Sequence, residues 1–344
     1  MSYIIPSAWL GGPRYIPLRK FLLDRQIDTI VMLPFDVFKD AYIDTAVLVV
    51  AEDQPDSSHV VRTYTYGKRE KIAAIGLADQ DYEEVPQETW RSLDDNKYVL
   101  DPSTVRLLRR LSETCDRTIG DVALVKRGVL FDDSLLVDSR KTHNHHRYFE
   151  GDVYRYRANM QLGHWVEFGD EMSEKPKDFF WFEGTRILLR RLVNRQQRLM
   201  ATLATETFIT NKNLYSVITA DEDLDAHALL AVLNSKLVSY LYLKQVSQAT
   251  KDDFPQVTIR DIRALVFPSE TSLQGMSTRL VPAVQRMLDL HKRLATATIP
   301  ADKNLYQRQV EATDEEIDAL VYELYGLTEE EIAIVERCAQ RPIC

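Results

Sequence analysis

The sequence predicts a mixed α/β protein with half of a doubly wound, Rossmann-like sheet, a β-rich middle region and a helical C-terminal tail. Ile27–Val50 indicates the sheet: it has the pattern of a short strand at Ile30–Leu33, a turn carrying Phe35 and Phe38, and a buried strand of β-branched residues at Thr45–Val50. The middle region has runs of Val, Ile, Leu and Thr between polar turns, and a 3.6-residue apolar period fills the last quarter. Because open α/β sheets bind ligands where neighbouring strands end, the aromatic turn is a candidate ligand edge.

Further elements are expected around this stretch. Pro17 opens a helix, since proline suits a first turn that has no N–H to lose, and its apolar side is Leu18, Phe21 and Leu22. The other elements of the first region are a strand within Tyr3–Leu10, strands at His59–Gly67 and Lys71–Ile75, and an acidic polar loop at Tyr82–Lys97 that contains Trp90. Strands with both faces apolar leave an open edge, so something outside this chain, or an irregular cover within it, must complete the sheet.

Four parts are predicted along the chain. They are a sheet region at 1–100, a linker helix at 101–116, a strand-rich domain at 117–270 and a helical tail at 271–344. The strand-rich domain is expected to contain strands at Ile187–Val193, Met200–Thr210 and Leu214–Thr219, followed by one helix at Leu224–Val246. In the tail, Thr313–Glu316 and Thr328–Glu331 have the pattern of capping boxes that begin helices, and Gly326 that of a helix C-cap.

Composition favours a soluble globular protein. Of 344 residues, 45% are apolar and 28% charged, and no run of about 18 apolar residues predicts a membrane span. The N-terminus lacks the pattern of a signal peptide, and Cys115, Cys338 and Cys344 form no CxxC pair. We therefore expect a cytoplasmic protein with reduced thiols and no membrane partner.

The distribution of charge does not exclude nucleic acid as a partner. The net charge is −9, whereas proteins that bind nucleic acid tend to be basic. The segment from Arg117 to Glu270 holds 21 basic and 21 acidic residues, so the flanks carry the whole excess of acid. The middle region is therefore locally more basic than the total suggests.

Arginine and tyrosine alternate in this middle region as a DNA-binding surface requires. Arginine can bind phosphate or form two hydrogen bonds with guanine, and tyrosine can hydrogen-bond a phosphate. No acidic residue occurs between Gly184 and Thr205, so the arginines of that segment have no acidic neighbour in the sequence. The candidate DNA-binding residues are Arg147, Tyr148, Arg155, Tyr156, Arg186, Arg190, Arg191, Lys212 and Asn213. The alternatives are a solvated strand, a solvated hairpin and, around Lys212, a simple turn. Asn234 and Ser235 are expected to serve local packing.

Other chemistry is weakly indicated. His143, His145 and His146 lack a second set of ligands at metal spacing, so we expect a polar loop and no metal. Pro55-Asp56 with the later Asp95–Lys97 fits a nuclease pattern only loosely, across a long acidic loop. No catalytic residue is assigned in this chain.

Residues 1–50 resemble the last strands of the catalytic domain of adenine-N6 DNA methyltransferases from restriction–modification systems. The resemblance lies in Tyr3–Leu10, in the helix containing Arg19–Leu23, and in Val37–Ala41 followed by Asp44-Thr45. In that family the aromatic that matches Phe38 stacks on an adenine turned out of the duplex, an arrangement that recovers lost base stacking. Spacing alone favours core positions for Phe35 and Phe38, and the resemblance favours the stacking role for Phe38.

Residues 117–268 resemble the TaqI-like target-recognition domain of the same family. The matching motifs are Ile119–Asp121 with Arg127-Gly128, Arg147–Tyr156, Arg186–Arg191, Asn211–Tyr215, Leu229–Leu237 and Phe254–Val257. Val153 is a conservative departure from the usual isoleucine, and Asp314–Glu336 is similar to the family's helical tail. The order and spacing of these motifs are more specific than any one of them.

The family's catalytic motifs are missing. The chain contains no Pro-Pro, and so lacks the Asn/Asp-Pro-Pro-Tyr/Phe tetrapeptide that holds the adenine amino group, and it lacks the glycine-containing cofactor motif. The resemblance implies that this chain alone does not methylate. It would bind double-stranded DNA, while an N-terminal catalytic segment or subunit binds S-adenosyl-L-methionine. A non-catalytic specificity or adaptor protein, and a decayed remnant, are the alternatives.

Overall fold

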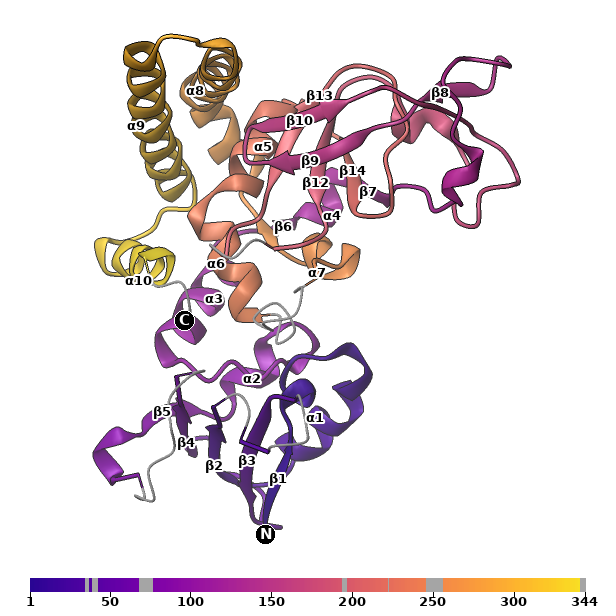
Figure 1. The fold of residues 1–344 in the computed structure, drawn as a ribbon. Coiled ribbons are helices and arrows are strands. Elements are labelled where there is room, and N and C mark those ends of the chain that lie inside the picture. Colours follow the sequence, from indigo (N-terminus) through magenta and orange to yellow (C-terminus); the bar gives the residue numbers. More distant parts are fainter. Residues whose placement is uncertain are drawn as a thin grey trace. The chain divides into compact units, whose positions relative to one another are not determined.

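The computed structural model describes residues 1–34, 37–38, 43–67, 77–193, 197–221, 223–245 and 256–340. It has the mixed α/β composition that the sequence predicts (Figure 1). The chain forms two compact units. Unit 1 contains Met1–Thr114, Leu241–Asp253 and Glu329–Cys344, and unit 2 contains Cys115–Tyr240 and Phe254–Thr328.

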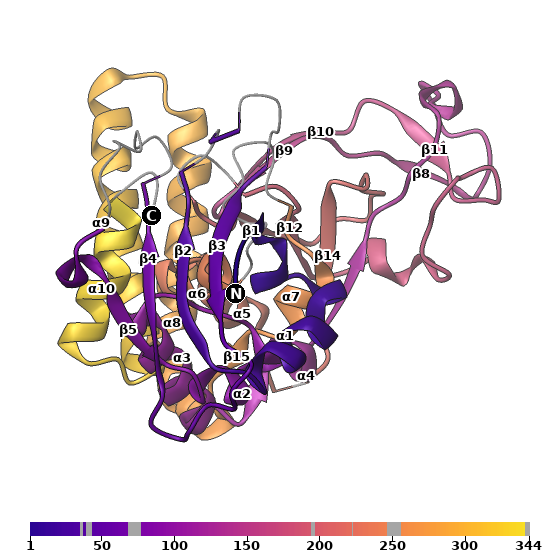
Figure 2. The same ribbon diagram turned by 90° about the horizontal axis from the view of Figure 1, so that it is seen from below.

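Unit 1 contains a five-stranded mixed sheet in the order β1-β3-β2-β4-β5 (Figure 2). β2 is parallel to β4, and the other neighbours are antiparallel. The strands are β1 (Ser2–Pro6), β2 (Ile27–Met32), β3 (Thr45–Val50), β4 (Val60–Thr65) and β5 (Glu83–Pro86). The predicted strands of Ile27–Val50 are confirmed, and Ile27, Ile30 and Leu48 are buried between them. Phe35 and the predicted strand Lys71–Ile75 lie outside the described residues.

Helix α1 (Ile16–Leu23) begins next to Pro17, but its predicted buried side is wrong in part. Leu22 and Leu23 are buried, whereas Leu18 is 38% and Phe21 is 52% exposed. Arg19 occupies the buried side instead and donates to the carbonyl oxygens of Trp9 (2.8 Å) and Gly12 (2.7 Å). These two bonds, with a third from Nε to the carbonyl oxygen of Asp95 (3.0 Å), offset part of the cost of burying a charged side chain on this side of the helix.

The predicted acidic loop at Tyr82–Lys97 is also partly wrong, because it contains strand β5 and a short helix, α2 (Thr89–Ser92). Trp90 is fully buried, donates from Nε1 to the carbonyl oxygen of Val99 (2.8 Å) and packs on Tyr98, with ring centroids 4.4 Å apart. The acidic residues that suggested a loop are therefore close in sequence to a buried aromatic pair, Trp90 and Tyr98. Unit 1 is completed by α3 (Pro102–Thr114) and α10 (Glu329–Gln340), joined by the bidentate pair Arg110–Glu331 (2.6 Å for each bond).

Unit 2 is built on an antiparallel sheet in the order β13-β12-β14-β7. Its strands are β7 (Ala123–Arg127), β12 (Arg186–Arg190), β13 (Ala201–Ala204) and β14 (Leu214–Thr219). The predicted strand Met200–Thr210 is therefore much shorter than expected. Three two-stranded pairs accompany the sheet: β6 (Arg117–Thr118) with β15 (Val266–Phe267), β8 (His145–Arg147) with β11 (Trp165–Glu167), and β9 (Glu150–Tyr154) with β10 (Arg157–Gln161).

The predicted single helix Leu224–Val246 is two helices, α5 (Ala226–Asn234) and α6 (Lys236–Gln245), with a bend of 58° between them. The break lies at Ser235, whose backbone is extended (ψ 155°) and whose hydroxyl accepts the N–H of Val238 (3.1 Å) at the start of α6. The preceding Asn234 is fully buried, and its amide accepts from the N–H of Ala201 (2.9 Å) and donates to the carbonyl of Ala201 (3.0 Å). Within the described ranges no single helix is long and apolar enough to cross a membrane, although this bent pair passes that test by length and composition.

The remaining helices of unit 2 are α4 (Ile119–Val122), α7 (Ile259–Arg263), α8 (Glu270–Thr296) and α9 (Pro300–Leu324). The predicted helix start at Thr313 is wrong, because Thr313 lies inside α9 and its hydroxyl donates back to the carbonyl of Gln309 (2.7 Å). Gly326 follows α9 with a φ of 58°, the left-handed conformation expected of a C-cap glycine.

Candidate nucleic-acid interface

One end of the unit 2 sheet gathers cationic and amide side chains. β12 ends at Arg190, which is the Cα partner of Leu214 at the start of β14. The N–H of Arg191 donates to the carbonyl of Asn213 (2.8 Å). We call Arg190, Arg191, Lys212 and Asn213 the strand-end cluster. These residues come from two segments about 20 positions apart, and the antiparallel register of β12 and β14 brings them together.

A glycine sets the path of the loop that carries this cluster. The N–H of Gly128 donates to the carbonyl of Leu214 (3.0 Å), and a Cβ at position 128 would lie only 2.2 Å from the carbonyl oxygen of Asn211. Asn211 in turn accepts the N–H of Asn213 through its side chain (2.8 Å), which forms the predicted turn. The Asn213 side chain is exposed, so it is available to a ligand.

Arg147 and Tyr148 lie beside the same loop. The carbonyl of Arg147 accepts from the N–H of Ile209 (2.8 Å), and the half-buried Tyr148 is hydrogen-bonded to the side chain of Asn211. Burial raises the pKa of Tyr148, the direction that favours the protonated phenol, which is a hydrogen-bond donor. The exposed Arg147 guanidinium lies over Trp165, 5.5 Å from the ring centroid.

Most of the positive charge of this surface is available to a ligand. Within the described part of the chain, Asp152 is the one carboxylate within 4 Å of the cluster's three cations, and it lies 3.7 Å from Arg190. That carboxylate is 56% exposed, so the pair is weak. Arg191 donates to the amide oxygen of Gln256 (2.5 Å), a contact that leaves its charge intact.

Two other candidate residues, Arg155 and Tyr156, belong to a packing site between the β9–β10 turn and α9. Arg155 makes a bidentate ion pair with Asp314 and donates from Nε to the carbonyl of Asn234 (3.1 Å). Burial acts against its charge, but the Asp314 carboxylate outweighs burial, and the net pKa of Arg155 is raised. Tyr156 is 2% exposed at a φ of 59°. Both side chains are used inside the protein, and we leave them out of the proposed DNA contacts.

Arg186 is likewise a structural residue. It is 1% exposed, donates to the carbonyl oxygens of Gly184 (3.0 Å), Glu206 (2.7 Å) and Phe208 (3.2 Å), and lies over the Phe208 ring. Burial lowers the pKa of Arg186 to about 10. Sequence pattern cannot separate this arginine from Arg190, because both end the same strand.

Phe38 lies in unit 1 and is 42% exposed, in a stretch whose neighbours at 35–36 and 39–42 lie outside the described residues. Its predicted stacking on a flipped base stays a prediction. Lys126, exposed on β7 and paired in register with Ser216, was not singled out from the sequence. The alternation of buried and exposed residues in β7 was the signal that could have found it.

Two of the three histidines in the predicted polar loop, His145 and His146, pack against other parts of the protein. His145 is buried and its Nδ1 lies 2.8 Å from the hydroxyl of Thr142, while the ring of His146 packs on Phe179 at 3.9 Å between centroids. Burial lowers the pKa of His146. Among the residues that the structure describes, no group of three or more His, Cys, Asp or Glu side chains is arranged to hold a metal ion.

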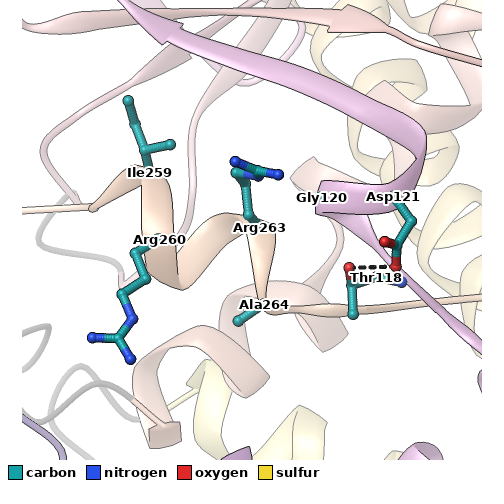
Figure 3. A pocket seen from close by; sticks show the side chains of 7 residues that line it. All are labelled: Thr118, Gly120, Asp121, Ile259, Arg260, Arg263 and Ala264. Atoms are coloured by element: carbon teal, nitrogen blue, oxygen red, sulfur yellow. Dashed lines mark hydrogen bonds between the residues drawn. The ribbon is translucent and has the colours of Figure 1, made fainter. Parts of the chain in front are cut away.

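A pocket of about 560 Å³ lies between α4 and α7 (Figure 3). None of the strand-end cluster residues is among the residues that line it. Its lining includes Arg260, Arg263 and Asp121, but the Asp121 carboxylate is held by the N–H (2.8 Å) and hydroxyl (2.7 Å) of Thr118. The side chains of Arg260 and Arg263 do not converge on one point in Figure 3, and we assign no site there.

Unit 2 thus has an antiparallel sheet with a cationic, amide-bearing loop at one end, and side chains of these kinds are common ligands of nucleic acids. Residues 146–265 match the family described as "TaqI-like C-terminal specificity domain", and this part of the chain is such a domain. The match covers the strand-end cluster, Arg147 and Tyr148.

Longer restriction–modification proteins are similar to nearly the whole chain. The chain is 27% identical over 333 residues to a Methanocaldococcus jannaschii protein named "Putative type II restriction enzyme and methyltransferase RM.MjaORFECS2P", covering 94% of this chain and 27% of that protein. The solved structure of the Type IIL restriction–modification enzyme MmeI in complex with DNA matches 99% of this chain and 49% of its own, with a TM-score of 0.57 and 12% identity, which shows a shared fold. The type IIG restriction endonuclease BpuSI matches with a TM-score of 0.37, 13% identity and 94% and 47% coverage, too low a score for argument. The chain thus spans about a quarter to a half of these proteins.

Proposed function

We propose that this chain is the DNA-binding and sequence-recognition portion of a site-specific adenine-N6 DNA methyltransferase or restriction–modification enzyme. The specificity-domain match over residues 146–265 carries this proposal. The strand-end cluster supports it, because its partly exposed cations and the exposed Asn213 lie together within that domain. A non-catalytic specificity or adaptor protein is the second candidate, since no catalytic or cofactor motif is found in the sequence.

In this proposal the residues divide the work of recognition. Arg147, Arg190, Arg191 and Lys212 hold DNA phosphates or guanine edges, which are the usual ligands of such side chains. Asn213 presents an exposed amide suited to an adenine edge, and Tyr148 donates its phenolic proton to a phosphate. The proposed DNA contacts therefore come from one loop region rather than from the whole predicted list.

The methylation chemistry belongs to a catalytic segment or subunit. That partner supplies S-adenosyl-L-methionine and the tetrapeptide that holds the target amino group, and the intact system works in the cytoplasm. Phe38 would stack on the extruded adenine, which fits an aromatic side chain that is 42% exposed.

Salt-dependent binding tests the DNA-recognition role. The affinity for a mixed pool of short duplexes should fall steeply with salt, and Arg191→Ala should reduce the slope of log K against log salt by about one, as loss of one phosphate contact does. Arg308→Ala is the matched control, since this exposed arginine of α9 lies outside the specificity domain. Equal effects of the two variants would remove the strand-end cluster from the interface.

Base flipping separates the two candidate functions. A duplex with 2-aminopurine at the target adenine should brighten in the reconstituted enzyme and brighten less with Phe38→Ala, because the aromatic face stabilises the extruded base. A probe that stays dark in the presence of bound protein would favour the adaptor function.

A further inference from the structure

A further pocket, of about 290 Å³, lies within unit 2 where the β9–β10 hairpin meets α8 and α9. Its lining comes from the turn of the hairpin, from Met200 and from both helices, so segments that are far apart in the chain assemble it. None of the strand-end cluster residues lines this pocket. Since a water molecule occupies roughly 30 Å³ in the liquid, the pocket has room for about ten non-hydrogen atoms. It therefore has the size of a small organic molecule.

Three buried apolar side chains line the pocket. Met200, Met287 and Val310 are 5%, 1% and 9% exposed. Methionine adapts its shape to its neighbours, and its sulfur makes favourable contacts with aromatic rings. This part of the pocket therefore suits an apolar body, and an aromatic ring in particular.

Arg157 supplies an uncompensated positive charge beside these apolar side chains. Its guanidinium lies over the ring of Tyr154, 4.2 Å from the centroid, and the ion pairs found among the described residues do not include it. Stacking on a ring leaves the N–H edges of a guanidinium free, and these edges match the two oxygens of a carboxylate. The neighbouring Arg155 is less suited to this role, because it already makes a bidentate pair with Asp314.

Two polar side chains in the wall of the pocket have an unpaired group. The hydroxyl of Tyr156 and Nδ1 of His291 are buried and have no hydrogen-bond partner among the described residues. Tyr156 is 2% exposed, and its φ of 59° is rare for an aromatic residue. Backbone conformations of this kind cluster at functional sites, and an unpaired buried polar group requires an explanation such as a bound molecule.

The charges around the pocket favour a ligand with one negative charge. Burial, and then Arg157 and Arg155, lower the pKa of His291 to about 4, so its imidazole is neutral at neutral pH. The carboxylate of Asp314 acts in the opposite direction and has a smaller effect, so the field at the imidazole is positive. The exposed carboxylate of Glu311 also lines the pocket and would repel a ligand that carries several negative charges.

We propose that this pocket binds a small organic carboxylate with an aromatic body, whose carboxylate pairs with Arg157 and whose ring lies against Met200 and Met287. The ligand joins the hairpin, which lies within the TaqI-like specificity domain, to α8 and α9, which follow that domain in the chain. A molecule that binds the folded chain alone stabilises it, so occupancy of the pocket raises the stability of unit 2. The inference goes beyond the proposed function and does not depend on DNA binding.

Methyl NMR of the full chain, labelled at methionine, tests this site with benzoate as the probe. The chain has seven methionines, of which Met200 and Met287 line the pocket. Benzoate should shift these two methyl signals in a saturable manner and raise the Tm. It should bind about ten-fold or more tightly than benzamide, which has a similar shape and no charge. Inorganic phosphate, an anion without an apolar body, should also bind more weakly than benzoate.

Two arginine variants locate the carboxylate. Arg157→Gln should weaken benzoate binding about ten-fold or more and remove the preference for benzoate over benzamide. Arg308→Gln is the matched control, since this exposed arginine of α9 does not line the pocket, and it should leave both affinities unchanged. Unchanged signals from the other five methionines verify that each variant is folded.

Three results would overturn the inference. They are the absence of a benzoate-induced shift at Met200 and Met287, equal affinities for benzoate and benzamide, and equal benzoate affinities of Arg157→Gln and Arg308→Gln. Because these measurements contain no DNA, they are unaffected by a failure of the proposed DNA recognition.

Discussion

Arg155→Ala should destabilise the protein without weakening its intrinsic affinity for DNA. The sequence pattern groups Arg155 with DNA-binding arginines, but the structure joins its guanidinium to both carboxylate oxygens of Asp314 and to the carbonyl of Asn234. The side chains of Arg155 and Asp314 are 21% and 22% exposed, so the pair is largely withdrawn from water.

The expected loss follows from what the substitution leaves behind. Removal of a buried partner costs about 3–5 kcal/mol when the remaining charge is left fully uncompensated. Here a fifth of each side chain is exposed, and Arg198 and Lys236 still act on Asp314, so we expect about 2–4 kcal/mol. For a unit of this size, that corresponds to a fall in Tm of about 4–16 °C.

Chemical denaturation and DNA titration on the same samples measure the two effects. Asp314→Ala should lose a similar free energy of unfolding, and the double variant should lose less than the sum of the two single losses. Arg308→Ala, an exposed residue of the same helix, should change stability by less than about 0.5 kcal/mol. A stable Arg155→Ala protein with a reduced salt slope of DNA binding would refute the structural role.

Three other substitutions test separate features. Gly128→Ala should cost about 1–3 kcal/mol and weaken DNA binding, because its Cβ forces the Asn211 loop away from β7; unaltered denaturation and binding curves would contradict this. Gln87→Ala should lower the free energy of unfolding by about 1–3 kcal/mol in urea denaturation. The reason is that the buried amide of Gln87 accepts the N–H of Ile27 (2.9 Å) and donates to the carbonyl of Arg25 (2.7 Å). An unchanged free energy of unfolding would argue against a stabilising role for these two hydrogen bonds. His291→Gln should flatten the pH dependence of the free energy of unfolding. Burial, and then nearby arginines, lower the pKa of His291 in the folded protein from 6.5 to about 4. The unfolded chain therefore binds the proton first, and the stability of the wild type falls as pH drops from about 6.5 towards 4. Identical pH profiles for wild type and variant would rule this out.

Local pattern predicted the elements whose signals are short-range. The β-branched run Thr45–Val50, the helix beside Pro17 and the glycine at 326 all lie where the sequence places them, because strand alternation, proline and a left-handed cap act within a few residues. The same local reasoning placed a helix start at Thr313 and extended one helix across Asn234. Both errors occur at a hydroxyl side chain that can either cap a helix or lie within one. Thr313 donates back to the carbonyl of Gln309 inside α9, whereas Ser235 accepts the N–H of Val238 and begins α6.

The residue types of a DNA-binding surface were determined by the sequence alone, whereas their use was decided by tertiary structure. Arg186 and Arg190 end the same five-residue strand and look alike in the sequence, yet Arg186 is buried among carbonyl oxygens and the Arg190 side chain is 25% exposed. Burial depends on which segments pack over each end of the strand, and those segments are distant in the chain. The sequence also predicted a sheet with an open edge, and the tertiary structure decided that β1 is an edge strand, paired with β3 alone in the described sheet.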